Sequence, residues 1–197
     1  SSRKGMKIVI ELKRDANAQL VLNQLYTYTQ LQDTVGVIML ALVNGEPKTL
    51  TLRQMLEEYI KFQEQIITRR TIFDLKKAKE RAHILEGLVI ALDYIDEVIS
   101  IIRSHYTSQE GKEVLMERFG LDDIQAQAII QMPLGRLAGM EREKLKAETD
   151  ELHEKIAEYN AILADEKRVR AIVKQELLEI KEKFNDPRRT EIASVEG

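Results

Sequence analysis

The chain has 197 residues, and its 33 acidic against 30 basic side chains leave a net charge of −3. This balance excludes the strongly basic composition of a free-standing nucleic-acid binder, and the absence of cysteine excludes a disulfide framework. With only 5% aromatic residues and three prolines, the composition favours long helices, so we expect a mainly α fold with a small α/β part.

The apolar runs and the first residues of the chain indicate where the protein resides. No apolar run approaches the roughly 20 residues that cross a bilayer, and no basic-then-apolar leader opens the sequence. We therefore expect a soluble protein of a reducing compartment with no membrane partner. Because the chain starts at Ser1 without Met, directly before strand-like sequence, we also expect it to be a piece of a longer protein.

The first 51 residues predict a small piece of mixed strands and helix. Residues 6–12, MKIVIEL, form a β-branched run that fits a short strand. In residues 16–28 the apolar side chains recur at spacings of three and four, which predicts a helix, with Asp15 as its cap.

A hairpin is predicted at the end of this piece. Residues 37–43 are continuously apolar and read as a buried strand. Asn44 and Gly45 tolerate positive φ angles in a tight turn, so the strand can pair with the residues that follow it. The whole piece, residues 1–51, is too small to bury a core unaided.

Residues 52–86 predict the ascending helix of a long coiled coil. From residue 52 to 104 there is no proline and only one glycine, Gly87. Apolar residues alternate in steps of three and four, with a phase slip between Ile66 and Leu75. The seam positions are Leu52, Met55, Tyr59, Phe62 and Ile66, then Leu75, Ala78, Ala82, Leu85, Val89 and Leu92.

Residues 141–184 predict the returning helices of the same arm. Their apolar rhythm breaks between Leu163 and Val169, where Asp165 is a candidate N-cap, so we expect a break near residues 164–168. Two seams in one chain satisfy each other as an antiparallel hairpin. The returning seam consists of Leu145, Thr149, Leu152, Ile156, Tyr159 and Leu163, then Val169, Val173, Leu177, Ile180 and Phe184.

Charge supports this pairing and the position of a hinge. Residues 69–81 carry six basic and two acidic side chains, whereas residues 141–166 carry nine acidic and four basic ones. Opposite charges beside a seam help to set its register. Because the two phase slips lie roughly level in the hairpin, we predict a hinge partway along the arm.

Between the two helices of the arm, residues 87–140 predict a helical head. Thr107 begins a capping-box pattern, Gly120 is a natural helix stop, and Asp122 can open the next helix. Pro133 must bend the chain.

An apolar tip follows the proline, and it is either a contact between two copies of the chain or a purely internal turn. We favour the contact between copies, because an exposed apolar surface at the end of a long arm is typical of a site that a protein partner buries. The predicted contact residues are Ile129, Met132, Leu134, Leu137 and Met140.

The sequence offers no convincing catalytic, cofactor-binding or metal-binding residues. The three histidines have no ligand-like spacing, and no phosphate-binding glycine motif occurs. None of the six tyrosines lies in a local cluster of basic and acidic residues that would make it a nucleophile. One basic stretch could contact a phosphate backbone, although a solvated face paired with acids explains it better. Its members are Arg69, Arg70, Lys76, Lys77, Lys79 and Arg81.

Several strings of the sequence resemble the A subunits of bacterial DNA gyrase, which are type IIA DNA topoisomerases, with the C subunit of topoisomerase IV as the close relative. The resemblance extends from residue 5 to residue 193, and the strings RAHILEGL and DIQAQAI favour gyrase. The matching strings are IVIELKRDAN, RAHILEGLVIALDYIDEVISIIR, ERFGLDDIQAQAI, PLGRLAGMEREKL and DPRRTEI.

The resemblance implies a place in a larger enzyme. Residues 1–51 match the end of a tower domain, residues 52–86 and 141–184 match a coiled-coil arm, residues 87–140 match the exit gate where two subunits meet, and residues 185–197 lead towards a wrapping domain. The implied enzyme introduces negative supercoils by ATP-dependent passage of one duplex through a transient break in another.

The resemblance also implies which parts of this enzyme lie elsewhere. The catalytic tyrosine belongs upstream, so the chain itself is expected to be non-catalytic. Mg²⁺ and ATP are expected on a partner B subunit, and the whole assembly is expected in the bacterial cytoplasm at the nucleoid, bound to double-stranded DNA. Two alternatives remain, namely a nucleic-acid-binding helical arm of another enzyme and an enzyme in its own right.

Overall fold

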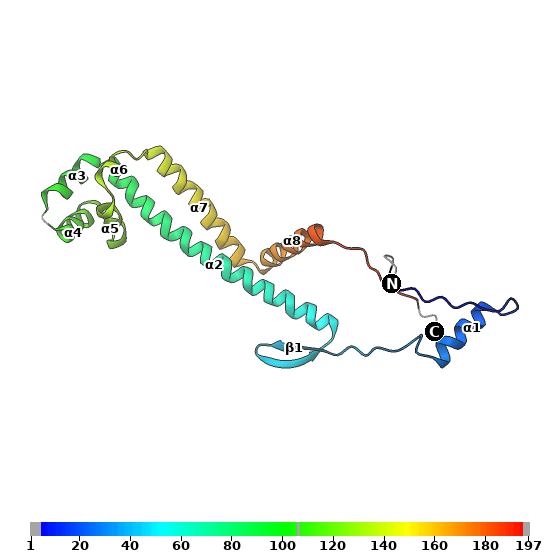
Figure 1. Cartoon of the computed structure of the whole chain (residues 1–197). Helices are drawn as coiled ribbons and strands as arrows, with labels where there is room; N and C mark the ends of the chain where they lie inside the picture. The colour runs from blue at the N-terminus through cyan, green and yellow to red at the C-terminus, as the bar shows by residue number, and fades with distance from the viewer. Residues whose placement is uncertain (1–4, 106, 195–197) are drawn as a thin grey trace. The chain divides into compact units, whose positions relative to one another are not determined.

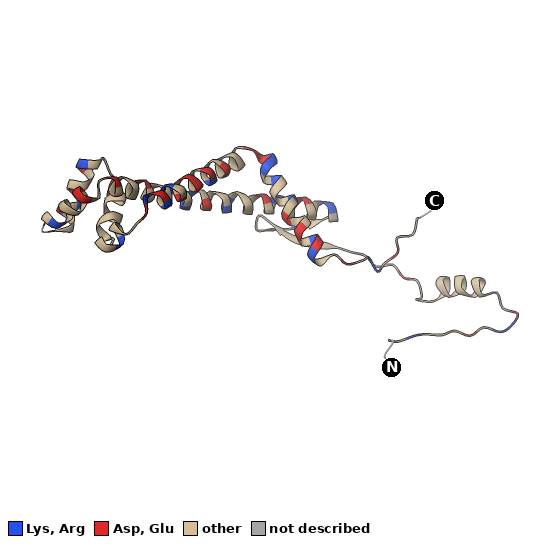
Figure 2. Cartoon of the chain, turned by 90° about the horizontal axis from the view of Figure 1, so that it is seen from above, with Lys and Arg blue, Asp and Glu red and all other residues tan. Residues whose placement is uncertain are grey.

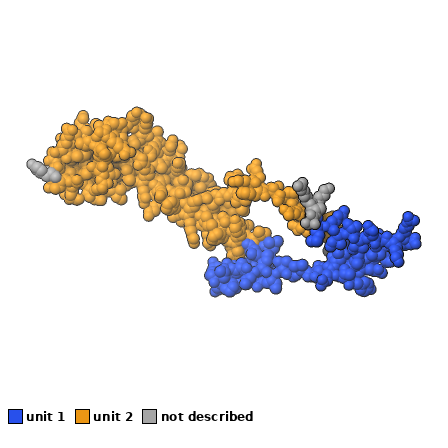
Figure 3. All heavy atoms as spheres, in the orientation of Figure 1, with its two compact units in different colours: residues 1–55 blue, residues 56–197 orange. Residues whose placement is uncertain are grey.

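The computed structural model describes residues 5–105 and 107–194. The chain divides into two compact units, Ser1–Met55 and Leu56–Gly197, which are coloured separately in Figure 3. Helices form most of the described part, and the strands found there form one two-stranded antiparallel sheet. The predicted mainly α fold with a strand hairpin is therefore confirmed.

The first unit contains the predicted helix and the predicted hairpin. Helix α1, Ala18–Tyr28, is capped by Asn17, whose side-chain oxygen accepts hydrogen bonds from two backbone N–H groups of the first turn. The cap is thus two residues later than the predicted Asp15. Such a cap satisfies donors that have no partner inside the helix.

Strands β1, Met39–Val43, and β2, Glu46–Leu50, pair in an antiparallel hairpin. Asn44 and Gly45 connect them with φ angles of 52° and 80°. Positive φ at both central residues is what a type I′ turn requires, and its twist matches that of the flanking strands. The predicted turn is confirmed.

The predicted strand at residues 6–12 is wrong for this chain. These residues form no strand, and their apolar side chains are exposed, Met6 by 93% and Ile8 by 83%. A β-branched run has the propensity for a strand, but a strand also needs a neighbouring sheet edge for its backbone hydrogen bonds. No described part of the chain supplies that edge.

The arm is a helical hairpin in the second unit. Helix α2, Leu52–Asp93, is unbroken over 42 residues, and α7, Arg142–Ala164, runs antiparallel beside it, as Figure 1 shows. Helix α8, Glu166–Phe184, continues the return path and diverges from α2. At 1.5 Å per residue, α2 is about 60 Å long. The predicted antiparallel arm is confirmed.

The seam of the arm differs from the predicted one at its lower end. Ile67 and Thr71 are buried where a phase slip between Ile66 and Leu75 was predicted. Thr71 fits because its hydroxyl donates to the Ile67 carbonyl oxygen at 2.8 Å, which leaves its methyl group for packing. The seam therefore passes through this segment of α2 without a slip.

Where α8 diverges from α2, the predicted seam ends. On α2 the side chains of Leu52, Tyr59 and Phe62 are exposed, and on α8 those of Ile180 and Phe184 are exposed. The predicted packing of these positions within the chain is wrong, because the buried cluster that joins α2 and α8 is centred on Ile67, Val169 and Val173 and does not include them.

The predicted break between the two returning helices is confirmed at Asp165. Helix α7 ends at Ala164, and Asp165 adopts an extended backbone with φ −135° and ψ 108°. Its carboxylate accepts a hydrogen bond from the Lys167 N–H at 2.9 Å and so caps α8. The break lies on one side of the arm only, because α2 passes it as a continuous helix. Hinge motion at this break stays a prediction.

The head consists of α3, Ile95–Ser104, α4, Ser108–Phe119, α5, Asp123–Gln131, and the short α6, Leu134–Ala138. These helices pack around the end of α2 and the start of α7. Their common core contains fully or nearly fully buried residues from all six helices and one loop. The members are Leu85, Leu88, Ala91, Val98, Leu115, Leu121, Ala126, Ile129, Leu137 and Leu145.

The helix signals predicted in the head are confirmed, although of the capping box predicted at Thr107 the described residues show only the bond to the Thr107 hydroxyl. The Thr107 hydroxyl accepts from the Glu110 N–H at 3.2 Å, and Gly120 ends α4 with φ 65°, in the left-handed region that favours glycine. Asp122 caps α5 in a reciprocal capping box with Gln125. These caps fix where α4 begins and ends and where α5 begins, and so fix how the chain turns between these two helices.

Candidate functional site

A close contact between α2 and α5 fastens the head to the arm. Gly87 is buried in α2, and a Cβ atom added there would lie 2.9 Å from the Gln125 Cβ atom, closer than side-chain carbons approach. The Gln125 side chain, only 7% exposed, donates from Nε2 to the His83 carbonyl oxygen at 2.8 Å. The small residue allows the approach, and the amide then bonds the backbone of the facing helix.

Asp122 extends this contact into a network. Its carboxylate accepts from the Gln125 N–H at 2.9 Å, while the Gln125 Oε1 accepts from the Asp122 N–H at 3.2 Å. The same carboxylate contacts the His83 ring. The hydrogen bond from the Gln125 N–H is the largest cause that lowers the pKa of Asp122, partial burial opposes it, and the His83 ring lowers the pKa further. We call Gly87, Gln125, His83 and Asp122 the head clamp.

The lowered pKa of Asp122 predicts that the head is sensitive to acid. A carboxylate whose folded pKa lies below its ordinary value of 3.8 stabilises the fold above that value, and the contribution is lost as the pH falls through the folded pKa. We expect the urea midpoint of the chain to fall as the pH is lowered below about 4. Urea unfolding followed by circular dichroism across this range measures the effect.

The matched variants for this prediction are neighbours in the sequence. Asp122→Asn should unfold with a midpoint that depends less on pH in the same window, whereas Asp123→Asn should retain the full dependence. Equal pH dependence of the two variants would assign the acid sensitivity to other carboxylates of the chain.

A second link joins the base of the head to the arm. The Arg142 guanidinium at the start of α7 forms an ion pair with Asp93, the last residue of α2. The hydrogen bond and the charge of Asp93 raise the pKa of Arg142 above its ordinary value. This pair and the head clamp hold the head at two places on α2.

The five predicted contact residues of the tip lie at different depths. Ile129 and Leu137 are fully buried in the core of the head, so in this conformation they offer no surface to a partner. Met132, Leu134 and Met140 are half-buried around the bend at α6. A contact between two copies stays a prediction, and only these three of the five can take part in it.

Two members of the predicted basic stretch connect the helices of the arm. The Arg70 guanidinium lies 2.6 Å from the Glu176 carboxylate of α8, and that of Arg81 lies 3.0 Å from the Glu148 carboxylate of α7. All four side chains are substantially exposed. Exposed ion pairs add little stability, so these pairs set the register of the arm.

The other members of the basic stretch lie on the surface of α2. Lys76 lies 3.9 Å from Glu80 on its own helix, and the Lys77 ammonium lies 4.8 Å from the centre of an aromatic ring. Arg69 and Lys79 are exposed. Figure 2 shows basic and acidic residues intermixed along the arm. This mixture favours the solvated, paired face over a phosphate-binding stripe.

The described part of the chain holds no sign of metal chemistry or of a membrane span. It contains no group of three or more His, Asp or Glu side chains that could hold a metal ion. No described helix is long and apolar enough to span a membrane. Tyr94 lies against Phe119 with ring centres 5.5 Å apart, whereas Tyr106 lies outside the described residues.

The head clamp was missed in the sequence. The histidines, His83 among them, show no ligand-like spacing in the sequence, and no motif gives Gln125 a role. One signal was available, because Gly87 is the only glycine in a run of more than 50 residues that otherwise favours helix. A lone glycine in a long helix costs stability unless something approaches closely.

Comparison with known proteins gives a consistent result. The family model that describes the A subunit of DNA gyrase/topoisomerase IV matches residues 1–178. The DNA gyrase A subunit of Clostridium acetobutylicum is 59% identical over 197 residues, and that of Halalkalibacterium halodurans is 56% identical over 196 residues; each alignment covers 100% of this chain and 24% of the relative. The DNA gyrase A subunit of Helicobacter pylori is 50% identical over 192 residues, which cover 98% of this chain and 23% of the relative. The chain spans about a quarter of the length of the relatives it matches.

Proposed function

The chain belongs to the family of DNA gyrase/topoisomerase IV A subunits, and we propose that it forms the coiled-coil arm and the dimer-forming head of a type IIA DNA topoisomerase. The observation that carries the proposal is a compact helical head fastened to the end of an arm whose α2 is about 60 Å long. Such an arm holds a contact between two heads far from any site at its base.

In the proposed enzyme two heads meet and form an exit gate. A DNA duplex that has passed through a transient double-strand break in another duplex leaves between them. We place the bond-breaking chemistry outside this chain, with ATP and Mg²⁺ bound through a partner B subunit. The mechanical role of the chain needs no catalytic side chain, only a rigid lever and a contact that can be separated.

The contact between heads is proposed to be small and centred on the tip. Met132, Leu134 and Met140 are the accessible apolar residues there. A gate that opens in each cycle needs a weaker interface than a permanent dimer has. The three half-buried side chains at the tip would form such a small interface.

Sedimentation or light scattering of the chain tests the proposal. We expect about twice the chain mass of 22.7 kDa. The double variant Leu134→Asp/Met140→Asp should sediment as a monomer with unchanged helix content. Ile72→Asp, which places the same charge on an exposed apolar residue in the middle of α2, should leave the dimer intact.

Two outcomes would contradict the assignment. A monomeric wild-type chain at micromolar concentration would remove the support for a gate in the head. A dimer that persists in the double variant would move the interface away from the tip, for which residues 89–102 are the next candidate.

A further inference from the structure

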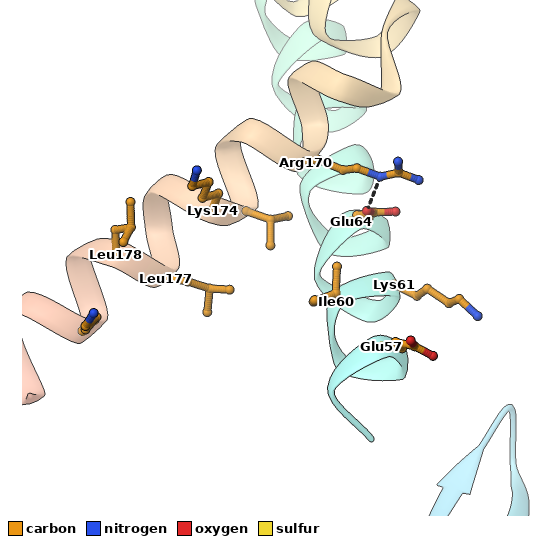
Figure 4. Close-up of a pocket in the computed structure, with 10 residues that line it drawn as sticks. Glu57, Ile60, Lys61, Glu64, Arg170, Lys174, Leu177 and Leu178 are labelled. Carbon is orange, nitrogen blue, oxygen red and sulfur yellow. Dashed lines mark hydrogen bonds and ion pairs between the residues drawn. The ribbon is translucent and has the colours of Figure 1, made fainter. Parts of the chain in front are cut away.

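A groove lies between α2 and α8, just beyond the break at Asp165 (Figure 4). Its volume is about 580 Å³. Sites for small molecules have volumes of roughly 300 to 1,000 Å³. The volume of the groove therefore fits a small ligand.

The floor of the groove is apolar and uncovered. Ile60 comes from α2, and Val173, Leu177 and Leu178 come from α8. Figure 4 shows Ile60 and Leu177 on facing sides of the groove. Ile60 is 41% exposed and Leu178 is 47% exposed. Apolar surface of this kind favours an apolar molecule that excludes water from both walls.

The rim of the groove is more basic than acidic. It carries Arg170 and three lysines against two glutamates, one of which, Glu64, accepts from Arg170 at 2.9 Å. This bridge joins the two helices at the end of the groove nearer the break. Lys174 and Lys181 have no ion-pair partner in the described part of the chain. They are seven residues apart on one face of α8, about 10 Å along the helix.

We propose that this groove binds one small amphiphile, a molecule with an apolar body and a single acidic group. The body lies between Ile60 and Leu177, and the acidic group lies within reach of the Lys174 and Lys181 ammonium groups. The apolar floor supplies affinity, and the basic rim selects an acid over a neutral or a cationic molecule of the same length.

A bound molecule also acts on the arm. Because the two walls belong to helices that pack together around Ile67 and Val173 and diverge beyond them, an apolar body between them holds α8 at one separation from α2. The ligand thus fixes the bend of the arm at its break. This step rests on the proposed function for its purpose, since a fixed bend would regulate the opening of the gate.

Titration of the whole chain with laurate, kept below its micelle concentration, tests the binding site. Calorimetry should give one laurate per chain. Dodecanol, which has the same length and no charge, and dodecylammonium should each bind at least about threefold more weakly. Binding of many laurate molecules per chain, or equal affinity for the neutral alcohol, would overturn the proposal.

Three variants locate the site. Leu178→Glu places a carboxylate over the apolar floor and should weaken laurate about tenfold or more. The double variant Lys174→Glu/Lys181→Glu should lose the preference for laurate over dodecanol. Lys146→Glu/Lys155→Glu, which makes the same charge change as the double variant at exposed positions of α7, should bind like the wild type.

These substitutions lie on exposed positions, so the fold should be retained, and unchanged helix content and urea midpoints check this directly. If Leu178→Glu keeps wild-type affinity while folded, laurate binds elsewhere and the groove is not its site.

The effect on the arm has its own test. The chain has no cysteine, so Tyr59→Cys and Gln175→Cys give two unique positions for spin labels. Laurate should narrow the distribution of distances between them. An unchanged distribution with laurate bound would overturn the effect on the bend. Dimerisation is measured separately by sedimentation, so failure of this inference and failure of the proposed gate are distinguishable.

Discussion

Replacing Leu137 by aspartate should unfold the head. The side chain is fully buried among the apolar residues of the head core. Burial of an unpaired carboxylate typically costs more than about 4 kcal/mol, a large share of the stability of a domain of this size. Urea unfolding and amide hydrogen exchange should show loss of protection throughout α3 to α6.

The same substitution three residues earlier should have a different result. Leu134 is half-buried at the start of α6, so Leu134→Asp leaves the core filled and should cost about 1 kcal/mol or less. Its effect should instead appear in the sedimentation of the chain. If Leu137→Asp retains wild-type stability, the core of the head has been placed wrongly.

Replacing Gly87 by alanine should push α5 away from α2 and weaken the packing of the head against the arm. The new methyl group would lie 2.9 Å from the Gln125 Cβ atom, which is fixed to the backbone of α5 and cannot rotate away. Alanine favours helix over glycine by about 1 kcal/mol, but overpacking of a tight contact costs about 1 to 3 kcal/mol, and the separated amide also loses its bond to the His83 carbonyl. We expect a net loss of stability.

Gly135→Ala is the matched control for this prediction. It adds the same methyl group to a helical glycine that has open space around its Cβ position. This variant should be neutral or slightly more stable than the wild type in the same urea experiment. If both variants are equally stable, helix propensity alone decides the outcome and the close approach of α5 has no energetic consequence.

The local signals of the sequence predicted the fold well. Asn44-Gly45, Thr107, Gly120 and Asp165 each fix a turn or a cap through their own backbone and side chain, so neighbours in the sequence suffice to place them. The apolar rhythm likewise predicted that two distant helices would pair.

Features that depend on distant residues were not predictable. The strand at residues 6–12 failed because its propensity is local whereas its pairing is not. The seam position at Thr71 was not predicted, because the residue is polar. Its side chain can pack in the seam once its hydroxyl donates a hydrogen bond to the preceding turn. Gln125 and His83 are 42 positions apart, and no pattern in the sequence shows that they meet.

At the tip, the sequence also did not predict which single side chains are buried. Apolarity and position placed Leu134 and Leu137 together as contact residues, but the short helix α6 turns one outward and the other into the core. A stretch of five helical residues is too short for its periodicity to indicate which side faces the head.

The break at Asp165 gives the two sides of the helical arm different continuity. The backbone of α2 continues as one helix past this level, whereas the return path leaves the helical conformation at Asp165. If the predicted hinge operates, bending is concentrated in the return path, and α8 changes its angle while the hydrogen bonds inside α2 stay intact.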